Sequence, residues 1–117
     1  MTIVIFHNPN CSKSRAALEV IRAAKVEPVV VPYLKTGWTK PQLQALFAVA
    51  GLSAREALRT AKGQAAALGL LDDGVSEEAI LGAMVAHPEL VERPIVCSPK
   101  EVRLCRPPER VRDLLPD

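Results

Sequence analysis

Among the 117 residues, Cys11 has the type and position that most clearly suit chemistry. It lies shortly after an apolar run that ends at Phe6 and directly before Ser12, where a helical pattern begins. The unpaired N–H groups and the positive dipole end of a helix start favour a thiolate over a thiol. We therefore expect the pKa of Cys11 to lie below the free value of about 8.5. The same N–H groups can bind a tetrahedral oxyanion.

The spacing around Cys11 excludes two familiar thiol chemistries. A phosphatase loop of the low-molecular-weight type needs an arginine six positions after the cysteine, where this chain has Ala17. A dithiol oxidoreductase needs a second cysteine three positions on, where this chain has Ser14. Cys11 therefore has no local disulfide partner, and any redox cycle must be completed by a thiol from another molecule.

The two other cysteines, Cys97 and Cys105, alternate with apolar residues in short strand-like runs, so we interpret them as structural. An odd number of cysteines without a C-x-x-C pair is typical of a reducing compartment. The chain starts directly on a strand pattern, and no apolar run approaches the roughly 20 residues of a membrane span. We expect a cytoplasmic protein that does not associate with membranes.

Arginines and small polar residues are the further candidates for an oxyanion site. Guanidinium groups give planar, paired donors for tetrahedral oxyanions, although a single arginine is more often a solvated surface charge. The arginine candidates are Arg59, Arg93 and Arg106. His7 is either an ordinary loop histidine or a hydrogen-bonding partner of Cys11. Asn8 and Ser14 either bind the oxyanion or cap the turn and the helix.

The elements that must position these residues follow from apolar spacing. Residues 3–6 and 28–33 read as strands buried on both faces, and a helix from Ser12 between them makes a parallel β-α-β unit. Later strands at 94–97 and 102–105 form a hairpin.

Helical segments fill the rest of the chain. Thr39 caps a helix that Gly51 ends, and Ser76 caps one that stops at His87-Pro88. Residues 53–58 are expected to form a short helix, 61–69 a helix or turn, and a last helix runs from Pro107-Pro108 to about Leu115. The order predicts one α/β domain with a four-stranded mixed sheet and a helical insertion at about 39–91.

Composition narrows the class of partner. With 49% hydrophobic and 24% charged residues, the chain is not of the disordered type. A net charge of +2 and only 3% aromatic residues give neither a basic patch nor a base-stacking surface for nucleic acid. Nothing indicates an extended apolar interface, so we expect a monomer, and we expect no metal site.

Several motifs together resemble one known family, the glutaredoxin-coupled arsenate reductases (ArsC family), in a short form. The motifs are His7-Asn8-Pro9, Cys11-Ser12-Lys13-Ser14-Arg15, Tyr33-Leu34, Arg93-Pro94-Ile95-Val96 and Arg106-Pro107-Pro108. They follow in order over essentially the whole chain. The resemblance implies a thioredoxin-like fold in a single domain spanning residues 1–117.

The resemblance also implies a reaction. Cys11 would attack arsenate and form a covalent adduct, with glutathione as co-substrate and glutaredoxin resolving the product, and without a bound cofactor. His7 would help to lower the pKa of Cys11, and Arg59, Arg93 and Arg106 would bind the oxyanion. Two alternatives stay open. One is an ArsC-like or Spx-like protein that binds RNA polymerase without reductase activity, and the other is a glutathione-linked thiol transferase with another substrate.

Overall fold

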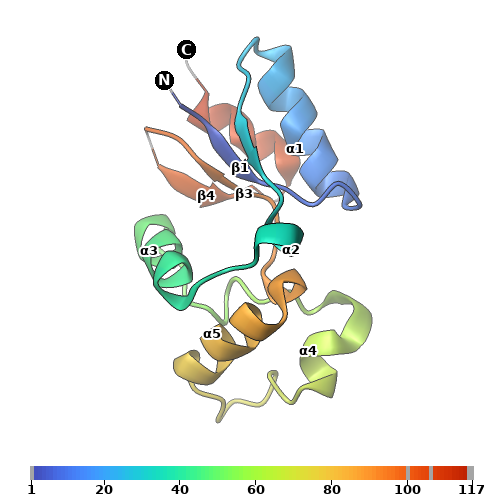
Figure 1. The fold of residues 1–117 in the computed structure, drawn as a ribbon, viewed down its shortest axis with the longest axis vertical. Helices are drawn as coiled ribbons and strands as arrows, with labels where there is room; N and C mark the ends of the chain where they lie inside the picture. The colour runs from blue at the N-terminus through green and yellow to red at the C-terminus, as the bar shows by residue number, and fades with distance from the viewer. Residues whose placement is uncertain (1, 100, 106, 116–117) are drawn as a thin grey trace. The chain divides into compact units, whose positions relative to one another are not determined.

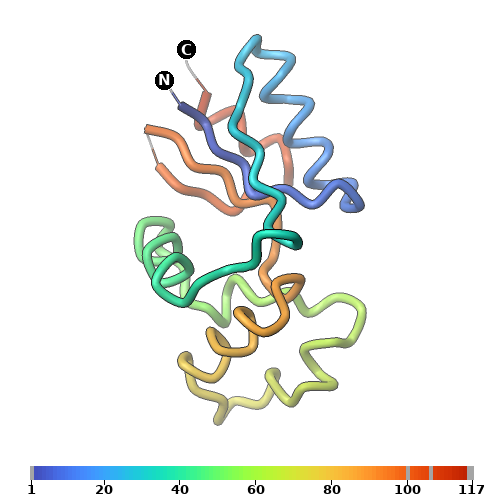
Figure 2. The backbone as a smooth tube through the Cα atoms, in the orientation of Figure 1, coloured from blue at the N-terminus to red at the C-terminus, as the bar shows by residue number. Residues whose placement is uncertain are grey.

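The chain folds into two compact units, Met1–Thr36 with Arg93–Asp117, and Gly37–Glu92. The structure is a computed structural model that describes residues 2–99, 101–105 and 107–115. Figure 1 shows the first unit as a sheet with helices, and Figure 2 follows the backbone as it leaves this unit after residue 36 and re-enters it at residue 93. The second unit is therefore inserted between strands of the first.

The first unit is built on a four-stranded sheet with strand order β2-β1-β3-β4. The strands are β1 (Val4–Phe6), β2 (Val29–Val31), β3 (Ile95–Cys97) and β4 (Val102–Leu104). β1 pairs in parallel with β2 and antiparallel with β3, and β3 pairs antiparallel with β4. This confirms the mixed sheet, the β-α-β unit and the late hairpin.

One strand is less buried than we expected. β2 lies at an edge of the sheet, and the side chain of Val29 is 53% exposed. The three consecutive valines were interpreted as a strand buried on both faces. β-Branched residues suit any pleated strand, however, and the sequence alone does not tell an edge from a centre.

One face of the sheet is covered by α1 (Ser12–Ala23) and by η3 (Pro108–Leu114), which pack against each other. Buried residues of the strands, such as Ile5 and Val96, form a single core with Ile21 of α1 and Leu114 of η3. Helix α1 thus rests on the two central strands, and this fixes the position of its first turn.

The last helix forms as expected, but as a 3₁₀ helix. Its buried residues, Pro108, Val111 and Leu114, recur every three positions. A 3₁₀ helix has three residues per turn and places such residues on one face, whereas an α-helix would rotate them apart.

The second unit is helical. Its two longer helices are α3 (Lys40–Ala50) and α5 (Glu77–Ala86), which contact each other. Thr39 and Ser76 cap them as predicted, and Gly51 ends α3 in the left-handed region at φ 70°. The shorter pieces are η1 (Ala61–Gly63), α4 (Gln64–Ala67) and η2 (Pro88–Leu90). These confirm a helical insertion after the second strand.

The prediction of a short helix at 53–58 is wrong. Ser53 and Glu56 do exchange the reciprocal hydrogen bonds of a capping box, at 2.9 and 3.0 Å. The chain then turns only once, because Leu58 pairs with Val91 in an antiparallel bridge. A further short helix, α2 (Tyr33–Thr36) in the first unit, had no clear signal in the sequence.

Candidate active site

Cys11 lies at the N-cap of α1, where the loop after β1 turns into the helix. Its backbone is extended (φ −105°, ψ 119°), as is usual for an N-cap residue. Its N–H donates to the carbonyl of Asn8 at 3.0 Å, and its carbonyl accepts from the N–H of Arg15 at 3.0 Å. A sulfur therefore occupies the place where a serine or aspartate oxygen would usually accept the first-turn N–H groups.

Opposing effects set the pKa of the Cys11 thiol. Partial burial alone would raise it, because burial disfavours the charged form. A hydrogen bond from the Arg93 side chain, backbone hydrogen bonds from Ser14 and Lys13, and the positive charge of Arg93 act in the other direction. Together they outweigh burial and lower the pKa below its usual value, as the helix start led us to expect.

Arg93 reaches the thiol because of how the strands pair. Phe6 at the end of β1 is opposite Ile95 at the start of β3. In an antiparallel pair, the residues just before Ile95 must therefore lie beside those just after Phe6. Arg93 is joined to Pro94 by a cis peptide bond and is only 5% exposed. A buried guanidinium at this point is suited to hold a negative charge.

His7, Asn8 and Ser14 form a buried cluster at the thiol loop, which is the loop between β1 and α1 that leads to Cys11. The ring Nδ1 of His7 lies 2.6 Å from the hydroxyl oxygen of Ser14, which also accepts the backbone N–H of Asn8 at 3.1 Å. Ser14 is fully buried. A hydroxyl has one proton and two acceptor positions, so Ser14 accepts the Asn8 N–H and pairs with Nδ1 as donor or as acceptor, depending on the tautomer of His7. The cluster ties the loop to the first turn of α1.

The pKa of His7 is lowered, first by burial and then by the charges of Arg22 and Arg15. The ring is therefore neutral near pH 7 and adds no positive charge next to the thiol. Its contact with Ser14 bears on Cys11 indirectly, because Ser14 also provides a backbone N–H for the sulfur.

Two more contacts hold the loop between β1 and α1. The amide oxygen of Asn8 accepts the backbone N–H of Asn10 at 3.0 Å, which is an Asx turn. The Arg15 guanidinium donates to the carbonyl of Pro9 at 2.7 Å. Asn8 and Ser14 were expected either to bind an oxyanion or to cap the turn and the helix. The contacts described here are of the second kind, which cap the turn and fix the loop.

The expected arginines are not all placed with the thiol. Arg93 contacts Cys11 within the first unit. Arg59 belongs to the second unit, where it is half-buried and its backbone N–H donates to the carbonyl of Leu90 at 2.7 Å. Arg106 lies outside the described residues. Roles for Arg59 and Arg106 at the thiol stay predictions.

All three cysteines are free, and they differ sharply. Cys105 is fully buried in the core of the first unit, and burial raises its pKa to about 12. Burial also raises the pKa of Cys97. Only Cys11 combines partial exposure with a lowered pKa, so it is the thiol suited to act as a nucleophile.

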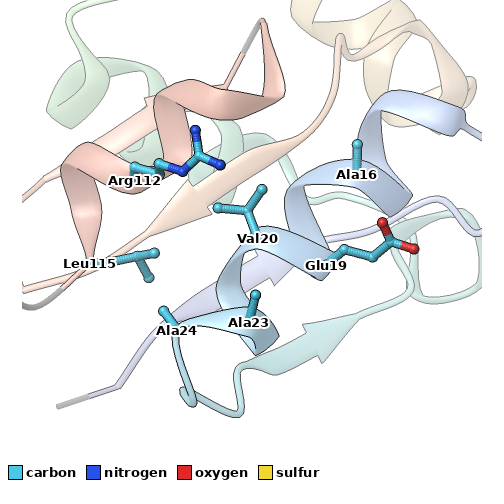
Figure 3. A pocket seen from close by; sticks show the side chains of 7 residues that line it. All are labelled: Ala16, Glu19, Val20, Ala23, Ala24, Arg112 and Leu115. Atoms are coloured by element: carbon cyan, nitrogen blue, oxygen red, sulfur yellow. The ribbon is translucent and has the colours of Figure 1, made fainter.

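A cavity of about 610 Å³ lies between α1 and η3, away from these residues. Figure 3 shows its walls, with Ala16, Val20 and Ala23 on the helix and Arg112 and Leu115 facing them. The small alanine side chains leave space between α1 and η3, and none of the residues grouped around Cys11 lines this cavity. The part of the chain described here contains no group of side chains that could hold a metal ion and no helix able to cross a bilayer.

Comparison with known proteins points in one direction. The model of the ArsC family matches residues 6–114. An arsenate reductase of Synechocystis sp., ArsI2, is 59% identical over 113 residues, which cover 97% of this chain and 81% of that protein. An arsenate reductase of Escherichia coli is 43% identical over 115 residues, covering 98% of this chain and 82% of the relative.

Solved structures agree with the sequences. An arsenate reductase from Vibrio cholerae superposes with a TM-score of 0.93 at 39% identity, covering 98% of both chains. A protein described as a putative arsenate reductase from Yersinia pestis superposes with a TM-score of 0.89 at 39% identity, covering 95% of this chain and 98% of that one. These matches confirm the thioredoxin-like fold class that the motifs implied.

Proposed function

The chain belongs to the ArsC family, and on that premise we propose that it reduces arsenate to arsenite, with Cys11 as nucleophile and glutathione and glutaredoxin as reductants. The observation that carries this proposal is the state of the Cys11 sulfur. The sulfur is partly exposed and accepts hydrogen bonds from Arg93 and two backbone N–H groups, and the pKa of the thiol is lowered. Such a thiol is ionised at neutral pH to a larger extent than a free one.

In the first step, the Cys11 thiolate attacks the arsenic of arsenate. A sulfur–arsenic bond forms, one arsenate hydroxyl takes up a proton, its bond to arsenic breaks and it leaves as water, and arsenic stays in the +5 state. The donors that hold the thiolate, namely Arg93 and the N–H groups of Lys13 and Ser14, are then placed to stabilise the negative oxygens that replace it.

In the second step, the thiolate of glutathione attacks the Cys11 sulfur. A sulfur–sulfur bond forms, the sulfur–arsenic bond breaks, and its electron pair remains on arsenic, which takes up protons and leaves as arsenite. Arsenic gains two electrons, and each of the two sulfurs loses one. A glutaredoxin thiolate then attacks the glutathione sulfur of the mixed disulfide and releases the Cys11 thiolate.

Ser14 and His7 act as positioning residues in this proposal. The neutral ring of His7 holds the Ser14 hydroxyl, and Ser14 presents its N–H to the sulfur. The remaining arginines, Arg59 and Arg106, are proposed to bind arsenate by the resemblance alone. The cycle requires reduced glutathione and glutaredoxin, which is the condition of the cytoplasm, and we place the protein there.

A coupled assay tests the proposal. Purified protein, glutathione, glutathione reductase and glutaredoxin are mixed, and arsenate-dependent oxidation of NADPH is followed. We expect turnover by the wild type, none above background by Cys11→Ser, and close to wild-type rates for the matched control Cys97→Ser. Equal rates for wild type and Cys11→Ser would contradict the proposal.

The same assay separates the thiol-transferase alternative. An enzyme that moves glutathione between thiols needs Cys11 but has no oxyanion to bind. A protein that reduces a glutathione mixed disulfide and ignores arsenate would therefore be a transferase, and our proposal would be wrong.

A further inference from the structure

A second cavity, of about 200 Å³, adjoins the thiol loop and is not used by the attack on arsenate. It lies between two segments that follow the parallel strands β1 and β2. From the first come His7, Pro9 and Asn10, and from the second come Pro32, Leu34 and Lys35. All of them belong to the first unit.

This cavity is close to the nucleophile. Asn10, one of its walls, is the residue directly before Cys11, and consecutive Cα atoms are only about 3.8 Å apart. Cys11 itself does not line the cavity, so a molecule held there would extend past Asn10 to bring a reactive atom to the sulfur. The loop itself is fixed by the contacts of Asn8, Ser14 and Arg15.

The chemistry of the walls suggests an organic anion. Pro9, Pro32 and Leu34 provide apolar contact, and Leu34 is 41% exposed although its side chain is large and hydrophobic. Lys35 is exposed at the rim and provides a positive charge, and Asn10 provides an amide. Arsenate itself would gain nothing from proline and leucine walls, whereas a peptide with a carboxylate would use every part of the site.

We propose that this cavity binds one end of glutathione, with a carboxylate at Lys35 and the peptide backbone against Pro9, Pro32 and Leu34. The inference rests on the proposed function and assigns a place to its second substrate. The volume is smaller than the 300 Å³ or more of a typical ligand site. It therefore accommodates one arm of the tripeptide and leaves the cysteinyl thiol outside, beside Cys11.

The strand order supports this assignment. β1, which leads to Cys11, lies between β2 on one side and β3 on the other. Arg93 comes from the β3 side, and the cavity residues 32–35 come from the β2 side. Displacement at sulfur is an in-line reaction, in which the new thiolate enters opposite the group that leaves. Arsenic bound near Arg93 and glutathione bound near Lys35 would lie on the two sides of β1, an arrangement compatible with such an in-line step.

Kinetics of two variants and a control test the proposal. Leu34→Ala and Lys35→Ala each remove one wall of the site, and we expect the KM for glutathione to rise about tenfold, the equivalent of about 1.4 kcal/mol. The KM for arsenate should change less than about twofold. Leu68→Ala, at a similarly exposed leucine (45%) in the second unit, should leave both constants unchanged.

Two kinetic outcomes would overturn the assignment. An unchanged KM for glutathione in both variants would show that the cavity does not bind it. A raised KM for glutaredoxin with an unchanged KM for glutathione would show that the residues dock the partner protein instead.

A binding measurement separates this inference from the proposed function. S-Methylglutathione, which cannot react, is titrated into ¹⁵N-labelled protein, and amide shifts are recorded. We expect the largest shifts at Asn10, Leu34 and Lys35. Shifts confined to the residues around Arg93 would overturn the inference even if arsenate is reduced. Shifts at the cavity in a protein that does not reduce arsenate would contradict only the proposed function.

Discussion

At the scale of single residues, the charge on one sulfur is set by a few neighbours. The helix start was visible in the sequence, and it correctly predicted the direction of the Cys11 pKa. The sequence could not show which arginine also lowers this pKa, because the contact with Arg93 depends on the pairing of Phe6 with Ile95, which are 89 positions apart. Nor could it show that His7 is neutral, since that follows from burial.

Changes at Arg93 should act on the thiol and on turnover together. A hydrogen bond to a charged group contributes about 1.5–3 kcal/mol. We expect Arg93→Ala to raise the pKa of Cys11 and to reduce kcat/KM for arsenate about tenfold to a hundredfold. Arg93→Lys keeps the charge but not the planar fork, so its loss should be smaller. The coupled assay at several pH values measures both effects.

Arg55→Ala serves as the control for that experiment, because this arginine is exposed and donates to the carbonyls of Asp72 and Val75 in the second unit rather than to the sulfur. A loss in Arg55→Ala as large as that in Arg93→Ala would contradict a specific role for Arg93.

At the scale of elements, the sequence correctly predicted those features whose hydrogen bonds join residues close together in the chain. The caps at Thr39 and Ser76 and the left-handed Gly51 were predicted and are present. The helix predicted at 53–58 does not form, although this segment carries a capping box, because Leu58 pairs in an antiparallel bridge with Val91, 33 positions further on. The 3₁₀ character of η3 could not be recognised from the sequence, because the apolar residues Pro108, Val111 and Leu115 also fit the i, i+3, i+7 spacing of an α-helix.

The capping box of α3 gives a prediction for stability. Thr39 accepts the N–H of Gln42 at 3.2 Å, and Gln42 accepts the N–H of Thr39 at 3.3 Å. Loss of the Thr39 hydroxyl in Thr39→Ala should lower the free energy of unfolding by about 1 kcal/mol. Urea denaturation measures it.

The chain offers a close control for this cap. Thr60 is also exposed and stands at an N-cap, but its side chain makes no capping bond. Thr60→Ala should therefore leave the urea midpoint close to that of the wild type. Similar losses in the two variants would mean that the Thr39 cap contributes nothing.

At the scale of the whole molecule, the candidate site depends on both ends of the chain. The thiol loop comes from the first residues, while Arg93 and η3 come from the last quarter, and the second unit is inserted between them. The sequence order predicted this arrangement, since strands at 3–6 and 94–97 had to share one sheet. It could not predict that β2 lies at an edge.

Leu114 tests how far the core of the first unit supports the thiol. It is fully buried in one cluster with Ile5 and Ile21. Removing three carbons from such a site costs about 2–5 kcal/mol, so Leu114→Ala should be strongly destabilised in thermal unfolding. Leu68→Ala, at a site that is 45% exposed, should lose less than about 0.5 kcal/mol. A small loss in Leu114→Ala would show that η3 is not part of the cooperative core.

The pH dependence of Cys11 alkylation tests the central claim most directly. Iodoacetamide reacts with thiolates, and mass spectrometry of the peptides reports each cysteine separately. A lowered pKa means that the folded protein favours the charged form, so the rate at Cys11 should reach its midpoint below the free value of about 8.5. Cys97 and Cys105, whose pKa values are raised by burial, should react only at higher pH. A midpoint for Cys11 at or above about 8.5 would contradict the account of an activated thiol.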